Sequence, residues 1–279
     1  MTTHRQATWL LVPGLSALLL LFYLPQALMF VVALGSRSPY GTVVYDVSLA
    51  NYLRALDPLY VKILWRSLML ALVTTLVCLV VSYPVAWWLG RVVRPKYRNA
   101  LLTLVILPFW TSFLVRMYAW IVLLRSEGVV NNALGLAGVP PLPLLYNDLA
   151  VLIGQVYGEL PFMIIPLYVS IEKLDDALLE AAADCGAGPL RSFTHVVIPQ
   201  TLPGIVAGCV LVFIPSLGAY LAPDLLGGGK TAYIGNLIQS QFAVARDVPF
   251  GAALSFVLSV VVLVLLAVFR RPLKSAQSL

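Results

Sequence analysis

The stretch EKLDDALLEAAADCGAGPLRSFTHVVIPQTLPG, residues 172–204, is the most polar internal segment of a chain that is otherwise strongly apolar. Its residues predict two short helices joined by a hinge. Asp175 or Asp176 is suited to cap the first helix, because an aspartate oxygen accepts hydrogen bonds from the free N–H groups at a helix start. Gly186 or Gly188 is suited to end that helix, because glycine readily adopts the left-handed conformation found at helix C-termini.

The second helix of this stretch is expected to begin at Pro189, since proline is favoured at the first helical position, and to end before Pro199. Its apolar residues recur at three- and four-residue spacing, as on one face of an amphipathic helix: Leu190, Phe193, Val196 and Val197. Such a helix pair needs a partner surface. Lipid headgroups are one alternative, which the acids of the stretch disfavour at an anionic membrane surface: Asp175, Asp176, Glu180 and Asp184.

The composition identifies the class of protein. Of 279 residues, 61% are hydrophobic and 11% are charged, and the mean hydropathy is +0.93, which indicates an integral membrane protein. The net charge of +6 comes from basic residues scattered between apolar runs, so it does not indicate nucleic-acid binding. Three distant cysteines and two histidines indicate neither a disulfide framework nor a histidine-based metal site.

Six apolar runs are long enough for membrane-spanning helices of ~20 residues. The first run exceeds the ~7–15 residues of a signal-peptide core, so we interpret it as a retained span. The sequence therefore predicts an all-α polytopic membrane protein that forms one domain over residues 1–279. The expected spans are residues 9–35, 62–89, 100–124, 149–170, 202–225 and 251–269.

The density of cations predicts the orientation. The link 91–98 holds four basic residues and no acid, and the C-terminal tail is also basic, which is typical of cytoplasmic segments. Both termini and the stretch 172–204 are then cytoplasmic. Basic residues also occur on the other side of the membrane, so the overall difference in charge between the two sides is small. The predicted orientation therefore depends on the local density of basic residues in these two segments. The basic residues concerned are Arg91, Arg94, Lys96, Arg98, Arg270, Arg271 and Lys274.

A second stretch, LGGGKTA at residues 226–232, ends like a phosphate-binding loop. The spacing of such a loop requires glycine where this chain has Asp224, whose carboxylate would repel a triphosphate. The predicted orientation also places the stretch outside the cell, away from cytoplasmic ATP. We therefore expect no nucleotide or other cofactor in this chain.

The polar stretch 172–204 resembles the EAA loop of ABC importer permeases, written E-A-A-x3-G-x9-I-x-L-P. Glu180-Ala181-Ala182, Gly186 and Pro199 stand at the matching positions. Val196 replaces the isoleucine and Ile198 replaces the leucine, and both changes are close in volume. The resemblance implies the type I importer permease fold, a place in the bacterial inner membrane, and a coupling helix that docks on a separate ATPase subunit.

Further expectations follow from this resemblance. The partner ATPase would bind ATP and Mg and hydrolyse the ATP, so that this chain is a transport subunit and not an enzyme. The other partners would be a second similar permease subunit, two copies of the ATPase and a periplasmic substrate-binding protein. The residues expected to couple the two subunits are Glu180, Ala181, Ala182, Gly186, Pro189, Ile198 and Pro199.

Most of the chain resembles the permeases of spermidine/putrescine importers, which implies a polyamine substrate. Alternatives are an ABC permease for another solute, such as an opine, another amine compound or ferric iron. An ion-driven secondary transporter would not need the EAA loop, and no motif of a membrane-embedded enzyme appears in the spans. The resemblance is carried by NYLRALDPLY from Asn51, LPFWTSFLVRMYAW from Leu107, LPFMIIPLYVSIEKLD from Leu160, DLLGGGKTAYIGN from Asp224 and RDVPFGAA from Arg246.

Two charged residues are expected inside the membrane, Arg116 in the middle of the third span and Glu159 within the fourth. Each would cost ~2.5–3.5 kcal/mol at a helix centre, so each should face protein or water. They either pair with one another for assembly or take part in transport. Aromatic faces with carboxylates suit an organic polycation. The candidate substrate path comprises Trp110, Arg116, Tyr118, Tyr157, Glu159, Tyr220 and Asp224.

Prolines and glycines interrupt the fourth and fifth spans. They could expose backbone carbonyls to a passing cation, or they could serve as packing and kink positions. The positions concerned are Pro161, Pro166, Pro215, Pro223, Gly204, Gly208 and Gly218.

Overall fold

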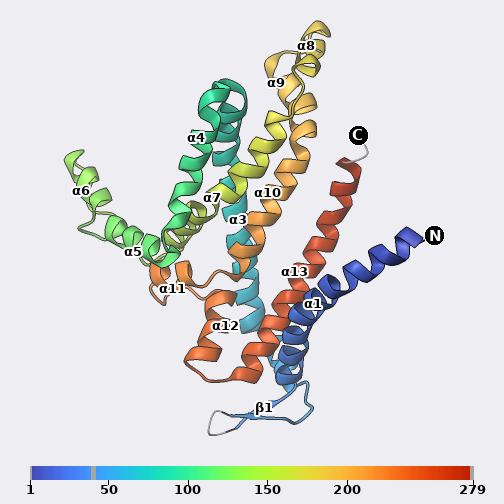
Figure 1. Ribbon diagram of the computed structural model, residues 1–279. Coiled ribbons are helices and arrows are strands. Elements are labelled where there is room, and N and C mark those ends of the chain that lie inside the picture. The colour runs from blue at the N-terminus through green and yellow to red at the C-terminus, as the bar shows by residue number, and fades with distance from the viewer. Residues whose placement is uncertain (1, 39–41, 277–279) are drawn as a thin grey trace. The chain divides into compact units, whose positions relative to one another are not determined.

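The computed structural model describes residues 2–38 and 42–276 and is almost wholly helical (Figure 1). The side chains of residues 1–11, 22 and 268–279, which include the basic tail, lie outside this description. The elements in chain order are α1 (Thr2–Ala33), β1 (Ser36–Arg37), β2 (Val43–Val44), α2 (Ala50–Ala55), α3 (Pro58–Trp87), the π-helix η1 (Trp88–Val92), α4 (Pro95–Ile106), the 3-10 helix η2 (Leu107–Trp110), α5 (Phe113–Leu124), α6 (Val129–Leu136), α7 (Asp148–Glu172), α8 (Asp176–Asp184), α9 (Pro189–Ser192), the π-helix η3 (Phe193–Val197), α10 (Ile198–Gly218), α11 (Leu221–Gly227), α12 (Ile234–Ala243) and α13 (Val248–Ala276).

The expected all-α membrane architecture is confirmed. Five helices of the described chain are long and apolar enough to cross a membrane, and one bent helix pair makes a sixth if it is counted as one span. The five helices are Val12–Ala33, Pro58–Val92, Asp148–Glu172, Pro189–Gly218 and Val248–Ala267.

The third expected span, residues 100–124, is not one straight helix. It consists of Pro95–Trp110 and Phe113–Leu136, which meet at an angle of 89°. The break falls after Pro108, where the chain tightens into η2 and then becomes extended at Thr111 and Ser112. Proline has no N–H to donate to the preceding helical turn, which weakens the helix there. Beyond it, the Thr111 hydroxyl donates to the Pro108 carbonyl at 2.7 Å. Arg116 therefore lies near the start of a short helix.

The polar stretch also differs in one respect from the sequence prediction. Its second helix was expected to end before Pro199, but α9, η3 and α10 run on as one span from Pro189 to Gly218. The π-helical turn η3 ends at Val197, two residues before Pro199. A π turn is wider than an α turn, so it gives room to a proline ring that would clash in a regular helix. The fifth span accordingly ends at Gly218, and α11 is separate.

The chain divides into two compact units, each of which has its own packing. The larger unit comprises residues 63–236 and 264–279, and α7 and α10 lie side by side in it (Figure 1). Gly204 lies against Pro166 and Ser170, and Gly208 lies against Met163, so the two helices approach closely where α10 has no side chain. The glycines are thus packing positions.

The hydrophobic core of this unit is formed by α3, η1, α7 and α10. A second cluster joins α5, α7 and α11. Buried polar groups connect the same helices: the Thr74 hydroxyl donates to Gln155 at 3.1 Å, and Tyr83 and Thr201 share a hydrogen bond of 3.0 Å. The largest fully buried side chains here include Leu89, Met117, Met163, Leu167, Ile171, Leu217 and Leu226.

The smaller unit comprises residues 1–62 and 237–263. Its short helix α2 begins at Ala50, whose N–H donates a hydrogen bond of 3.2 Å to Ser48 Oγ. The Asn51 amide donates to the Ala33 and Gly35 carbonyls at the end of α1, at 2.9 and 2.7 Å. These bonds satisfy carbonyls that a helix end leaves free.

Two stretches that carry the family resemblance, at residues 51–60 and 246–253, contact one another in this unit. Arg54 Nη1 forms an ion pair of 2.8 Å with Asp247, and its guanidinium lies 3.9 Å from the centre of the Phe250 ring. Asp247 in turn accepts from the Phe250 N–H at the start of α13. A small cluster of Ala33, Ala252 and Ala253 packs α1 against α13.

Candidate functional site

The polar stretch folds into a helix with well-formed ends. Asp175 Oδ1 accepts from the Ala177 N–H at 3.0 Å and caps α8, as one of the two expected aspartates. At the other end, the Gly186 N–H donates to Ala183 and the Ala187 N–H donates to Ala182, at 2.8 and 3.0 Å. These two bonds make a Schellman motif. Gly186 has φ +76°, so Gly186, and not Gly188, ends the helix.

The outer face of α8 and α9 is open to solvent. Glu180, Ala181, Gly186 and Pro189 are exposed, and Ala182 is half-buried. No hydrogen bond or ion pair between described residues involves the Glu180 side chain. Leu190 is 77% exposed beside a surface depression of about 610 Å³. The lining residues are Gly188, Pro189, Leu190, Arg191, Thr194 and His195.

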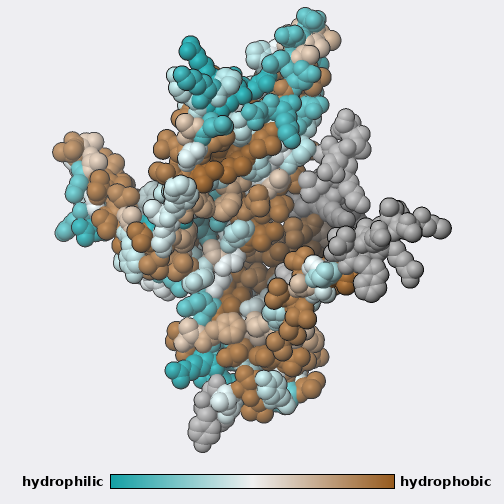
Figure 2. Space-filling model, in the orientation of Figure 1, coloured by the Kyte–Doolittle hydropathy of each residue, from teal (hydrophilic) through white to brown (hydrophobic). Residues whose placement is uncertain are grey.

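Hydrophilic residues gather at this end of the larger unit, over α8, α9 and the start of α4, whereas hydrophobic residues cover the middle of α4 (Figure 2). Ile198 is half-buried and Pro199 is exposed, at the start of α10. The capped helix α8 thus presents a charged residue and α9 an apolar one, and neither side chain has a partner within the described chain.

The base of the polar stretch is held by two arginines that sequence reasoning used only as signs of orientation. Arg91 Nη1 donates to the Leu174 carbonyl at 2.9 Å, and Arg91 forms an ion pair with Asp176. Arg98 Nη1 lies 3.4 Å from Glu172 Oε1. Their partners are more than 70 residues away in the sequence, so local pattern could not have indicated these contacts.

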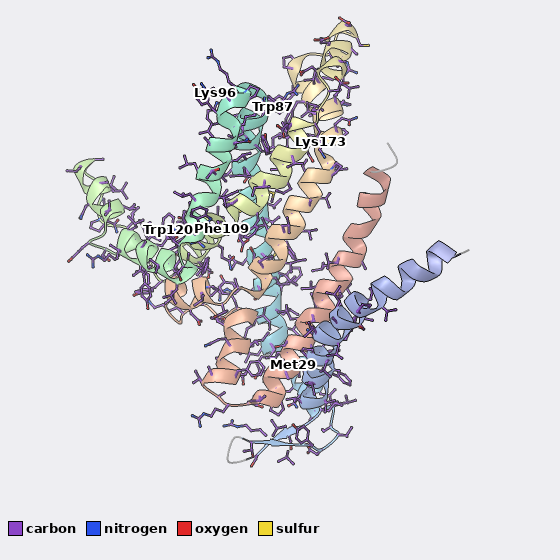
Figure 3. All side chains as sticks on the ribbon, in the orientation of Figure 1. Met29, Trp87, Lys96, Phe109, Trp120 and Lys173 are labelled. Carbon is purple, nitrogen blue, oxygen red and sulfur yellow. The ribbon has the colours of Figure 1, made fainter. Side chains whose placement is uncertain are left out.

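Arg116 lies in an aromatic surrounding. It is 9% exposed, and its guanidinium carbon lies 4.9 Å from the Phe109 ring centre, 5.3 Å from Phe113 and 5.9 Å from Tyr157. Phe109 is marked in Figure 3. Cation–π attraction is stronger when the cation is removed from water. Arg116 Nε and Nη1 are nevertheless buried without a hydrogen-bond partner among the described residues.

Glu159 lies two residues after Tyr157 on α7. Its Oε2 is also buried without a hydrogen-bond partner in the described chain. Arg116 and Glu159 form no ion pair within 4.0 Å in this structure, so the direct pairing weighed from the sequence is not made here. Two opposite charges, each with an unused polar atom, lie inside the helical bundle. Buried groups of this kind are typical of functional positions in membrane proteins.

The candidate substrate path is gathered only in part. Tyr157 contacts both Arg116 and the Trp120 ring, the latter at 5.6 Å between ring centres, and Trp120 is marked in Figure 3. The other four members are exposed: Trp110, Tyr118, Tyr220 and Asp224. Sequence reasoning missed Phe109 and Phe113. Their position in the same motif, seven and three residues before Arg116, was the available signal.

The glycine run of LGGGKTA has the opposite geometry to a phosphate loop. Gly228 and Gly229, with φ +59° and +71°, follow the C-terminus of α11. Gly228 lies against the Tyr146 ring. Phosphates bind at helix N-termini, where N–H groups are free, whereas a C-terminus presents carbonyl oxygens. The run is a helix stop.

Comparison with known proteins agrees with this geometry. Residues 82–271 match the family model described as the binding-protein-dependent transport system inner membrane component. The chain is 45% identical to the spermidine/putrescine transport system permease protein PotB of Escherichia coli strain K12, over 91% of this chain and 93% of that protein. It is 42% identical to PotB of Haemophilus influenzae, over 92% and 90%.

The fold has a counterpart among solved structures. A chain of a bacterial ABC transporter involved in the import of the acidic polysaccharide alginate superposes with a TM-score of 0.77, at 19% identity, over 97% of this chain and 96% of that one. The match of the family model covers well over half of the sequence, including the polar stretch and the helices that follow it. The chain therefore belongs to the family of binding-protein-dependent transport system inner membrane components.

Proposed function

We propose that this chain is the membrane-spanning permease subunit of an ABC importer that takes up polyamines such as spermidine or putrescine. The observation that carries the proposal is the coupling loop, residues 172–204. Within this loop, α8 is capped at both ends. The loop exposes the Glu180 and Leu190 side chains, for which the described chain offers no polar or ionic partner. The polyamine substrate is supported by the 45% and 42% identity to permeases named for spermidine/putrescine transport.

The proposed assembly follows from what this chain contributes and what it does not. The exposed face of α8 and α9 would dock on an ATPase subunit, which binds ATP and Mg. Two ATPase copies, a second similar permease and a periplasmic binding protein would complete the importer. The residues proposed to couple ATPase closure to this chain are Glu180, Ala181, Ala182, Gly186, Pro189, Ile198 and Pro199. The whole chain would act as one membrane domain.

ATP-dependent uptake into proteoliposomes tests the proposed function. The complex would be reconstituted with its binding protein, and radiolabelled spermidine and putrescine would be offered with ATP inside or outside the vesicles. We expect polyamine uptake that requires both ATP and the binding protein. An opine, another amine compound and ferric iron serve as competitors. Uptake of one of these in place of polyamines would contradict the substrate, and ATP-independent uptake driven by an ion gradient would contradict the importer class.

The orientation is part of the proposal: both termini and the coupling loop are cytoplasmic, and the link around Lys230 is periplasmic. The native Cys185 at the end of α8 is exposed, so it can report on the loop without substitution. In a chain whose other two cysteines are replaced by alanine, we expect Cys185 to resist an impermeant thiol reagent in intact cells. A Lys230→Cys variant on a Cys185→Ala background should react. Labelling of Cys185 and protection of position 230 would reverse the orientation.

A role for Glu159 in the substrate path is also proposed. Its unpartnered carboxylate and the rings around Arg116 together offer charge and aromatic faces to an ammonium group and its methylene stem. The same path would include Trp110, Tyr118, Tyr220 and Asp224.

Glu159→Gln is expected to lower uptake by roughly tenfold at an unchanged amount of complex, because a hydrogen bond to a charged group contributes about 1.5–3 kcal/mol. Glu159→Asp keeps the charge and is expected to retain more of the activity. A reduced yield of complex with normal uptake per complex would indicate an assembly role instead.

A further inference from the structure

The link between α3 and α4 carries four cations that differ in what they contact. Arg91 and Arg98 face the chain and have side chains only 16% and 20% exposed. Arg94 and Lys96 are exposed, and neither side chain makes a hydrogen bond or ion pair with another part of the chain that the structure describes. Lys96 is marked at the start of α4 in Figure 3. Of the four cations in this link, Arg91 and Arg98 therefore bind other parts of the chain.

The task of Arg91 is to hold the turn between α7 and α8. One guanidinium nitrogen, Nη1, donates to the Leu174 carbonyl at 2.9 Å, and the other, Nη2, pairs with the Asp176 carboxylate. Leu174 belongs to the turn, and Asp176 is the first residue of α8. A planar guanidinium with two such acceptors fixes direction as well as distance. Arg91 thereby orients α8 relative to the end of α3.

Arg98 makes the corresponding contact on α4. Its Nη1 lies 3.4 Å from Glu172 Oε1, and its Nε donates to the Val93 carbonyl at 3.1 Å. Glu172, the last residue of α7, also accepts a hydrogen bond of 2.7 Å from Tyr168. Both ends of the link 91–98 are thus bonded to the base of the coupling loop.

Close backbone packing supports the same connection. The π-helix η1 brings Gly90 next to Ile171, where a Cβ atom on Gly90 would lie 3.1 Å from Ile171 Cγ2. π-helical turns are frequent at functional sites. The polar contacts of Arg91 therefore lie beside an apolar contact between the same two segments.

We propose that Arg91 is a positioning residue for coupling, which transmits displacement of the coupling loop to α3 and α4. This inference rests on the proposed function of the loop. Without Arg91, a push on α8 would reach α3 and α4 only indirectly, through the end of α7, where Glu172 pairs with Arg98. With Arg91, the push also moves α4 and, through η2, the broken span that carries Arg116. The Phe109 ring of η2 packs on Phe162 of α7 at 5.0 Å, which continues the connection.

The test compares Arg91→Met with Arg94→Met, which removes a neighbouring cation that has no partner in the described chain. Both variants keep a long apolar stem and lose one charge. The measurement is the amount of polyamine imported per ATP hydrolysed, at equal amounts of reconstituted complex. We expect a fall of about fivefold or more for Arg91→Met, within the 5–150-fold range of coupling effects between sites, and no change for Arg94→Met. Arg91→Lys should recover part of the ratio.

A second measurement does not depend on transport. Spin labels at Cys185 and at a Tyr97→Cys substitution would report the distance between α8 and α4, in a chain in which the other two cysteines are replaced by alanine. We expect one narrow distance distribution for the parent and Arg94→Met, and a broader one for Arg91→Met. Asp176→Asn keeps the contact between Arg91 and the Leu174 carbonyl, so its distance distribution should have an intermediate width. This variant replaces Arg91→Met in the test if Arg91→Met does not assemble.

An unchanged import-to-hydrolysis ratio and an unchanged distance distribution in Arg91→Met would overturn the inference. Failure of the proposed function looks different. A parent complex that contains no ATPase, or imports without ATP, would remove the role of the loop before any arginine is changed. A lower yield of Arg91→Met with a normal ratio per complex would also overturn the inference, because it would give Arg91 an assembly role only.

Discussion

A valine in place of Gly186 is expected to lower import by roughly 5–30-fold while the protein still inserts into the membrane. Gly186 has φ +76°, and the left-handed conformation costs an L-residue about 1–2 kcal/mol. Such a cost shifts a two-state equilibrium by roughly 5–30-fold. No atom lies within 4 Å of a Cβ built on Gly186, so the effect comes from the backbone and not from a clash. The Schellman motif would open, and α8 would lose its fixed position relative to α9.

Two matched variants separate this explanation from a general intolerance of the loop. Gly188 also has open space around it, but its φ of −68° suits any residue, so Gly188→Val should import normally. Asparagine tolerates the left-handed conformation better than valine, so Gly186→Asn should retain much of the activity. ATP-dependent uptake and membrane content would be measured together for all three. Normal uptake by Gly186→Val would remove the assigned role of the hinge.

Gly204→Val is expected to prevent assembly of the complex. A Cβ atom on Gly204 would lie 2.5 Å from the Pro166 carbonyl oxygen and would overlap Ser170 Oγ, so α10 would have to move away from α7. Overpacking of this kind costs about 1–3 kcal/mol, and more where backbone must shift. The amount of complex extracted from the membrane should fall by roughly fivefold or more.

The same helix offers graded controls for this prediction. A Cβ atom on Gly208 would lie 2.6 Å from the Met163 sulfur, and a methionine side chain can move aside, so Gly208→Ala should lose less complex than Gly204→Ala. Gly218 ends α10, and a Cβ atom on it would have no neighbour within 4 Å, so Gly218→Val should assemble normally. The yield of complex in size-exclusion chromatography and its melting temperature would rank the variants. Equal yields for the valine variants at positions 204 and 218 would contradict the close packing of α7 and α10.

The parts of the fold that sequence predicts well are those determined by neighbouring residues. The Asp175 cap and the Gly186 stop each depend on bonds within about five residues, and both were recognisable as local patterns. The break of the third span was not predicted. Pro108 alone is compatible with a kinked membrane helix, and the 89° turn also needs the extended conformation of Thr111 and Ser112.

The candidate site shows the same division. Glu180 was identified from a motif, whereas the task of Arg91 was not, because its partners are 83 and 85 residues away. Four cations in a short link fit two explanations equally well: a signal of membrane orientation, or a set of ion pairs within the protein. Only the fold distinguishes Arg91 and Arg98 from Arg94 and Lys96.

The contacts of the smaller unit have a consequence for how the chain is made. Arg54 and Asp247 are 193 residues apart, so Arg54 leaves the ribosome long before its carboxylate partner exists. At synthesis rates of ~5–20 residues per second, the interval is roughly 10–40 s. During this time Arg54 lacks its ion pair, and Ala33 at the end of α1 has not yet met Ala252 and Ala253 of α13. A message truncated before codon 247 would fix the chain in that unfinished state and offer it to membrane proteases.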